Sequence, residues 1–328
     1  MKRRPTIKDV AQRSGVSVAT VSYVLNGKES AGVTEETKQR VLAAVSELGY
    51  VPNAAGTALR RGHSEIVLLI LDPTFVGEVS QRTVESTVGA LAELGHTVVI
   101  HTLVSEREAV KVVRSLQPRG VLLFAFVTAA THAELGVFGA GRVFGFPAVE
   151  GDPAAADRPW ERAIGRAQVR HLAERGHERV WYAFPEPSAR SVVAEHRLRG
   201  VREECSRLDL PDPQVFTLPL DRAGASTALS ELGIRGGVCG ADDRHGLAVL
   251  AAAADLGLSV PADVAVIGAE DTVEGRLSVP ALTSVRLAAS DDTVGFRGWL
   301  EAALDGKETT LMPGEAETLP EVVVRESV

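Results

Sequence analysis

The sequence predicts an α/β protein in which a small N-terminal helical head precedes two doubly wound parallel sheets. Residues 1–61 carry apolar side chains at helical spacing. After residue 65, short apolar runs alternate with helical stretches, which is typical of right-handed βαβ units whose sheet is buried on both faces. Charge separates the same two parts, because residues 1–61 hold ten Lys or Arg against five Asp or Glu in a chain of net charge −8. Attraction to phosphate is therefore concentrated at one end of an acidic protein.

The first two helices of the head are short and are joined by a tight turn. An apolar face predicts a helix over Ile7–Arg13, and Gly15 can take the backbone angles that the turn requires. Ser17 is a favourable N-cap for a second helix, which Asn26-Gly27 closes. Two helices joined in this way are typical of the helix-turn-helix, whose second helix enters the major groove of DNA. An ordinary helical hairpin is the alternative for this stretch taken alone.

A third helix and a short hinge segment complete the head. Thr34 caps a helix over Glu35–Leu48, whose first turn is acidic and so favours the helix dipole. A further short helix is expected over Asn53–Arg60, although Gly56 costs it about 1 kcal/mol relative to Ala. So short a helix is unstable alone in water, and it needs support from outside the segment to form.

The rest of the chain predicts two α/β halves divided by the Pro- and Asp-rich stretch Glu150–Pro159. The strands expected in the first half are Ile66–Leu71, Val98–Leu103, Gly120–Phe124 and Arg142–Phe146, with helices over Val84–Leu94 and Glu106–Leu116. In the second half the expected strands are Arg179–Phe184, Gln214–Leu218, Gly236–Gly240 and Val264–Gly268. The helices expected there are Trp160–Arg175, Ala194–Arg207, Gly224–Leu232 and Gly246–Leu256.

Several motifs resemble the lactose-repressor/galactose-repressor (LacI/GalR) family of bacterial transcription regulators. They include TIKDVA, GVSVATVS, VLNG, ELGYVPN and Leu59-Arg60 in the head, and GHERVWYA, VPALTSVR and LPEVVVRES later. The resemblance implies a helix-turn-helix DNA-binding domain over residues 1–50, a hinge helix and linker over 51–62, and a periplasmic-binding-protein-like core over 63–328. One subdomain would hold about 63–158 and 291–320, and the other about 159–290 and 321–328. A cytoplasmic homodimer is implied, acting as a repressor that binds a palindromic DNA operator under control of a small-molecule effector such as a sugar.

The start of the second helix holds the candidates for reading the DNA sequence. We expect Val18, Ala19 and Tyr23 to reach base edges. Tyr23 stands where many family members carry arginine; its ring can meet a thymine methyl group, although it cannot make the bidentate contact of arginine to guanine. The alternative is that Tyr23 packs beside the helix. The side chains suited to phosphate oxygens are Thr6, Ser17, Thr20, Ser22 and Asn26.

The hinge segment supplies three further candidates for DNA contact. Asn53 is expected to cap the hinge helix, and Arg60 can face phosphate. Leu59 matches the leucine that the family inserts into the minor groove.

Candidates for effector binding follow the predicted strands, because ligands of open α/β sheets bind beyond the carboxyl ends of the strands. They are Asp72, Phe75, Asp242 and Glu270, together with Arg197 on a helix. The family supports several of these positions, but Ala163 and Glu195 depart from its usual polar contacts and put a sugar site in doubt. A regulator with a vestigial or non-sugar site is therefore an alternative to an effector-controlled one.

An enzyme of the dinucleotide-binding kind is the remote alternative. Its only glycine-rich candidate, GAGRVFG at 139–145, has the wrong spacing and precedes a strand. Cys205 and Cys239 are too few for a disulfide framework or a metal site, so we expect no cofactor and no metal. The chain has no apolar run long enough to span a membrane and no signal peptide, which favours the cytoplasm.

Overall fold

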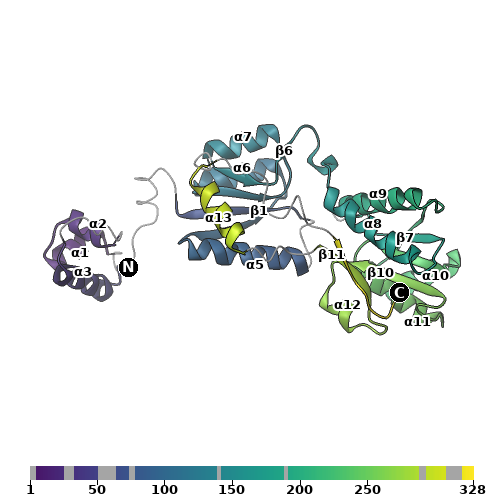
Figure 1. Ribbon diagram of the computed structural model, residues 1–328. Coiled ribbons are helices and arrows are strands. Elements are labelled where there is room, and N and C mark those ends of the chain that lie inside the picture. The colour runs from purple at the N-terminus through teal and green to yellow at the C-terminus, as the bar shows by residue number, and fades with distance from the viewer. Residues whose placement is uncertain are drawn as a thin grey trace. The chain divides into compact units, whose positions relative to one another are not determined.

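The computed structural model describes residues 5–25, 33–50, 64–73, 78–138, 142–187, 191–287, 293–307 and 320–328. The chain forms two compact units, Met1–Ser64 and Glu65–Val328 (Figure 1). Within the described ranges, we find no helix that is both long and apolar enough to cross a membrane.

The first unit holds three helices among its described residues: α1 (Ile7–Ser14), α2 (Val18–Leu25) and α3 (Glu35–Leu48). Their small core is formed by side chains that recur at helical spacing, namely Val10, Ala11, Val21, Val41 and Ala44. Gly15 ends α1 with φ 70° and Gly49 ends α3 with φ 60°, left-handed angles that glycine adopts without strain. The predicted turn at Gly15 and the third helix are thereby confirmed.

The first lobe of the second unit is built on a parallel sheet of order β2-β1-β3-β5. Its strands are β1 (Ile66–Leu71), β2 (Thr97–Thr102), β3 (Gly120–Phe124) and β5 (Val143–Gly145). Its helices are α5 (Glu78–Glu93), α6 (Glu106–Leu116), α7 (Ala129–Phe138) and α13 (Thr293–Leu304). Two short strands, β4 (Val127–Thr128) and β6 (Ala148–Val149), pair separately. Although α13 is far along the chain, Leu300 and Leu304 are buried in the same core as Leu122.

The second lobe is built on a six-stranded sheet of order β12-β11-β10-β9-β7-β8. Its strands are β7 (Val180–Phe184), β8 (Gln214–Thr217), β9 (Gly236–Gly240), β10 (Val264–Ala269), β11 (Thr283–Leu287) and β12 (Pro320–Val323). Its helices are α8 (Pro159–Ala173), α9 (Ser191–Arg207), α10 (Arg222–Leu232), α11 (Asp243–Asp255) and α12 (Val273–Leu277), and a 3-10 turn, η2 (Pro153–Ala155), precedes α8. All strands run parallel except β12, which is antiparallel to β11.

The residues after β12 are bonded into the same sheet. The hydroxyl of Ser327 donates to the carbonyl of Val266 at 2.6 Å and accepts from the Thr283 amide at 2.8 Å. Ser327 is completely buried, so this short segment supplies interior hydrogen bonds to β10 and β11.

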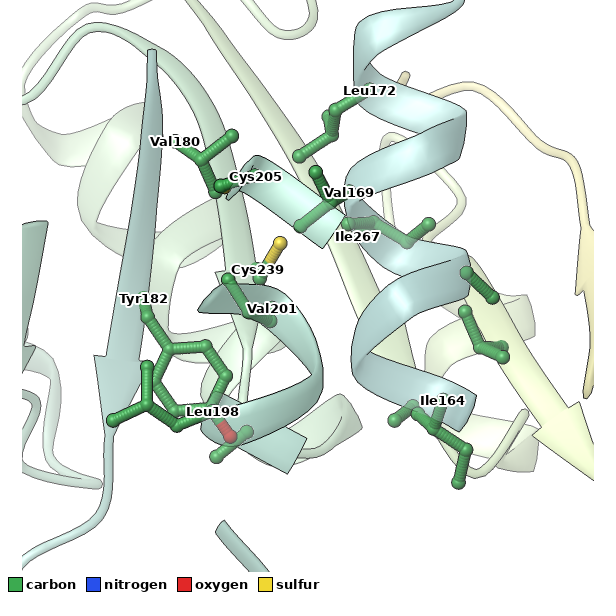
Figure 2. Close-up of a cluster of buried hydrophobic side chains, with 14 of the residues drawn as sticks. Ile164, Val169, Leu172, Val180, Tyr182, Leu198, Val201, Cys205, Cys239 and Ile267 are labelled. Carbon is green, nitrogen blue, oxygen red and sulfur yellow. The ribbon is translucent and has the colours of Figure 1, made fainter. Parts of the chain in front are cut away.

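Helices α8 and α9 cross with their backbones in close approach. A Cβ at Gly165 would overlap the carbonyl of Arg197, and one at Gly200 would overlap the carbonyl of Arg162. Only glycine therefore fits at either position. Side chains from α8, α9, β7, β9 and β10 form one apolar core (Figure 2). Cys205 and Cys239 are free thiols within it, and burial raises the pKa of Cys205 to about 11.

Candidate functional site

The start of α1 is held by a capping box. The backbone N–H and the hydroxyl of Thr6 both donate to the Asp9 carboxylate, each at 2.7 Å. The hydroxyl proton of Thr6 is thus already used within the helix. For Thr6 to donate to a DNA phosphate, as the sequence predicts, it must exchange this bond for one to the phosphate.

The start of α2 confirms Ser17 as its N-cap. The Ser17 Oγ accepts from the Thr20 amide at 3.0 Å and lies 2.9 Å from the Thr20 hydroxyl. Because the two hydroxyls share one hydrogen bond, one of their two protons stays available to an outside acceptor. Ser17 is exposed, whereas Thr20 and Ser22 are partly buried.

The predicted base-reading residues lie on an exposed face of α2. Val18 is 40% exposed and Tyr23 is 43% exposed, and Ala19 is also exposed. Val21 is fully buried against α1 and α3, so the helix is anchored by one side and open on the other. This exposure favours Tyr23 as a contact residue over its packing beside the helix. Four predicted DNA contacts lie outside the described residues: Asn26, Asn53, Leu59 and Arg60.

Arg197 forms the centre of the candidate effector site. Its Nε donates to Glu161 Oε2 at 2.6 Å and its Nη1 to the carbonyl of Ala241 at 2.6 Å, while Glu270 Oε1 lies 3.5 Å away. Burial alone would lower the pKa of Arg197, but the carboxylates of Glu161 and Glu270 raise it above its usual value. Arg197 therefore stays charged although it is almost completely buried.

Glu161 was not predicted from the sequence. It lies in the first turn of α8, four residues before Gly165, and the glycine crossing brings that turn against α9. The sequence at the start of α8 does not indicate that Glu161 is buried, because its burial depends on the crossing with α9 in the tertiary structure. Ala163 is partly buried, and Glu195 is exposed on α9.

Asp242 serves chiefly to begin α11. Its Oδ1 accepts from the His245 amide at 3.0 Å and from the His245 ring at 2.6 Å, and its Oδ2 lies 3.4 Å from Arg244. It directly follows Ala241, whose carbonyl binds Arg197. The structure therefore places Asp242 beside the Arg197 cluster, with one carboxylate oxygen committed to the helix cap.

The turn that carries Glu270 is strained and tightly held. Glu270 has φ 103° and Asp271 has φ 52°, left-handed angles that are rare for residues with a Cβ and cost roughly 1–3 kcal/mol each. Asp271 is held by Arg325, by Arg276 at 3.2 Å and by Arg286 at 3.3 Å. These ion pairs anchor the turn that carries Glu270.

A second buried carboxylate, Asp243, holds the same turn from α11. Its oxygens accept from the Thr272 amide at 2.6 Å, the Thr272 hydroxyl at 2.9 Å and the Ser284 hydroxyl at 2.6 Å. Burial raises the pKa of Asp243 to about 6, although these hydrogen bonds oppose the increase. Among the residues that the structure describes, no group of His, Cys, Asp and Glu is arranged to hold a metal ion.

Asp72 takes part in a different ion pair. It lies 3.2 Å from Arg158, whose guanidinium stands over the Phe126 ring at 5.2 Å from its centre. Arg158, which immediately precedes α8, was not predicted. The structure thus brings Arg197, Glu270 and the Ala241–Asp242 step together and pairs Asp72 with Arg158, while Phe75 lies outside the described residues.

Comparison with known proteins gives matches over both units. Residues 6–53 match the bacterial regulatory proteins of the lacI family, and residues 169–328 match the periplasmic binding protein-like domain. The chain is 30% identical to an HTH-type transcriptional regulator from the aml 5′ region of Streptomyces limosus, over 98% of this chain and 94% of that protein.

Solved structures match over almost the whole chain. The lac repressor dimer bound to operator and the anti-inducer ONPF has a TM-score of 0.74 at 20% identity, over 99% of each chain. The complex of the transcriptional regulator CelR with cellobiose has a TM-score of 0.60 at 25% identity, over 99% of this chain and 100% of that chain.

Proposed function

The chain belongs to the lacI family of bacterial regulatory proteins, and we propose that it is a cytoplasmic, dimeric repressor that binds a palindromic DNA operator under control of a small-molecule effector. The observation that carries the DNA-binding part is the exposed face of α2, where Val18, Ala19 and Tyr23 stand above a buried Val21. One helix-turn-helix per chain reads one half-site, so two subunits related by two-fold symmetry require a palindrome.

The test of this part is a footprint on sites selected from randomised DNA. Protection of two symmetric half-sites is expected, with affinity that falls steeply as salt is added, because the basic head acts through phosphate. Protection of a single asymmetric half-site by a monomer would contradict the proposal.

The hinge is proposed to act as the switch between the bound and released forms. The helix that the sequence predicts over residues 53–60 is too short to be stable alone, so we propose that DNA and the second subunit support it. Leu59 is the proposed wedge, and Leu59→Ala should reduce both specific binding and bending of the operator at its centre. Unchanged bending by this variant, measured by circular-permutation gel shift, would remove the wedge from the proposal.

For the effector we infer a neutral sugar or a small cationic ligand that binds beside Arg197, Glu270 and Asp242. Carboxylates accept from hydroxyl groups and a guanidinium donates to ring or hydroxyl oxygens, so this set suits a polyhydroxylated ligand. The CelR complex with cellobiose supports the sugar class. Asp72 and Phe75 are proposed to contribute from the other lobe.

A regulator without a small-molecule effector is the second candidate, and one observation favours it. Glu161 and the Ala241 carbonyl already hold Arg197 at 2.6 Å, so a ligand must bind beside a satisfied guanidinium or displace a partner. Calorimetry with glucose, galactose, maltose and cellobiose separates the two candidates. The effector proposal expects binding that weakens in Glu270→Ala and releases operator; equal affinity in the variant would place the site elsewhere.

We infer no catalytic role for the carboxylates of this site. Asp242 is engaged with His245 and Glu270 faces Arg197, which are roles in capping and charge pairing. In the glycine-rich stretch, residues 143–145 form strand β5 and not a phosphate-binding helix, which also supports this inference.

A further inference from the structure

Gln168 on α8 is completely buried at the carboxyl ends of two strands. Its Nε2 lies 2.9 Å from the carbonyl of Gly240 on β9 and 3.0 Å from the carbonyl of Gly268 on β10, with the Ile267 carbonyl at 3.4 Å. Because all three neighbours are carbonyl oxygens, the donating nitrogen of the carboxamide must face them. One side chain therefore bridges two strands.

The pairing between β9 and β10 ends just before the two glycines that Gln168 joins. The paired register of β9 and β10 ends at Cys239 and Ile267. Beyond it, the first turn of α11 comes close: a Cβ at Gly240 would lie 2.7 Å from the Gly246 nitrogen, and one at Gly268 would overlap the Asp243 carboxylate. A buried carbonyl that loses a donor costs roughly 1–3 kcal/mol, and the two N–H groups of Gln168 match the buried carbonyls of Gly240 and Gly268.

We propose that Gln168 is the positioning residue of the candidate effector site, which sets the separation of the two segments that carry Asp242 and Glu270. Each of these residues follows its bridged glycine by two positions. This inference rests on the proposed function, because it concerns the spacing of that same site.

The same face of α8 also places Arg197. Glu161, Gly165 and Gln168 recur at spacings of four and three residues, so they lie along one side of the helix. Glu161 binds Arg197, Gly165 permits the close crossing with α9, and Gln168 joins β9 to β10. One helix face therefore aligns the guanidinium with both strand ends.

The test compares Gln168→Met with Ser327→Ala in the full-length protein by hydrogen exchange. Methionine keeps the length of the side chain but has no donor, whereas Ser327→Ala removes a different buried hydrogen bond to β10, at Val266. The amides to follow are those of His245 and Thr272, which bond to Asp242 and Asp243 respectively. They report the order of the two segments without any ligand.

Gln168→Met should speed exchange at both amides by roughly tenfold or more, the factor expected when a buried carbonyl loses its donor. Ser327→Ala should instead act near Val266 and Thr283. If Gln168→Met does not fold, Gln168→Asn, which keeps the donors on a shorter side chain, is used in its place. Unchanged exchange, a change in one segment only, or a uniform change over the second lobe would overturn the role of Gln168.

Ligand binding gives an independent readout. For any of the four sugars that binds the wild type, Kd should rise roughly tenfold in Gln168→Met and change little in Ser327→Ala. Equal loss of affinity in both variants would also overturn the proposal. Because the exchange measurement needs no sugar, failure of the whole sugar panel counts against a sugar effector and not against the positioning role.

Discussion

Glu161→Gln tests whether the buried ion pair with Arg197 stabilises the second lobe. Glutamine has the size of glutamate and removes only the charge. The Glu161–Arg197 bond measures 2.6 Å, and the two side chains are only 12% and 5% exposed. A charge-assisted hydrogen bond in such a setting contributes about 1.5–3 kcal/mol. In the variant, Arg197 keeps its contacts with the Ala241 carbonyl and Glu270. The free energy of unfolding should therefore fall by about 2 kcal/mol, less than the 3–5 kcal/mol typical of a buried charge left without any partner.

Glu203→Gln is the matched control, because it breaks an ion pair between the same two helices at the surface. Glu203 lies 2.7 Å from Arg166, with side chains 46% and 34% exposed, so its loss should cost less than about 1 kcal/mol. Urea unfolding of wild type and both variants, followed by circular dichroism and by tryptophan fluorescence, gives the comparison. Equal losses for the two variants, or full stability of Glu161→Gln, would refute the reasoning from burial.

Three further predictions concern other parts of the molecule. Burial raises the pKa of Asp243 to about 6, above its ordinary value of 3.8, so between these pH values the folded protein holds a proton that the unfolded chain has released. The free energy of unfolding should therefore fall as pH rises from about 4 to about 6. Asp243→Asn should lack this part of the pH dependence in urea titrations at several pH values. Gly200→Ala should lower the melting temperature strongly, because its Cβ would overlap the Arg162 carbonyl. Gly298→Ala on α13 has open space around it and should be neutral or stabilising. Similar melting temperatures for the two variants would contradict the close helix crossing. Tyr23→Arg should change the bases preferred in a randomised-site selection, each good contact being worth about 1–3 kcal/mol of discrimination, and an identical consensus would exclude Tyr23 as a reader.

Much of the regular structure follows from local sequence signals. Helix α3 and strands β1, β3 and β9 have the predicted bounds, because buried runs and clear caps mark their ends. Helix α7 was not predicted, since its residues are apolar on several sides and show no single stripe. Strand β11 was also missed, because TSVRL is short and contains polar residues that only the tertiary structure buries.

The candidate site was predictable only in part, for reasons seen in single residues. Arg197 and Glu270 were found because a resemblance and a strand end point to them. The start of α11 was expected three residues late, because Asp242 was interpreted as a ligand carboxylate when it also caps the helix. Glu161 and Gln168 were missed, since their roles depend on a helix crossing and on where the pairing of two strands ends. Neither feature leaves a pattern in local sequence.

The bonds of Ser327 bear on the order in which the protein is made. Its hydroxyl completes β10 at Val266, a strand that is 61 residues earlier in the chain. During synthesis the three helices of the head leave the ribosome first and can pack around Val21 at once. The second sheet must wait, with Val266 and Thr283 lacking their buried partner until Ser327 has emerged. The second lobe can therefore complete these buried hydrogen bonds only after the helices of the first unit have had time to pack.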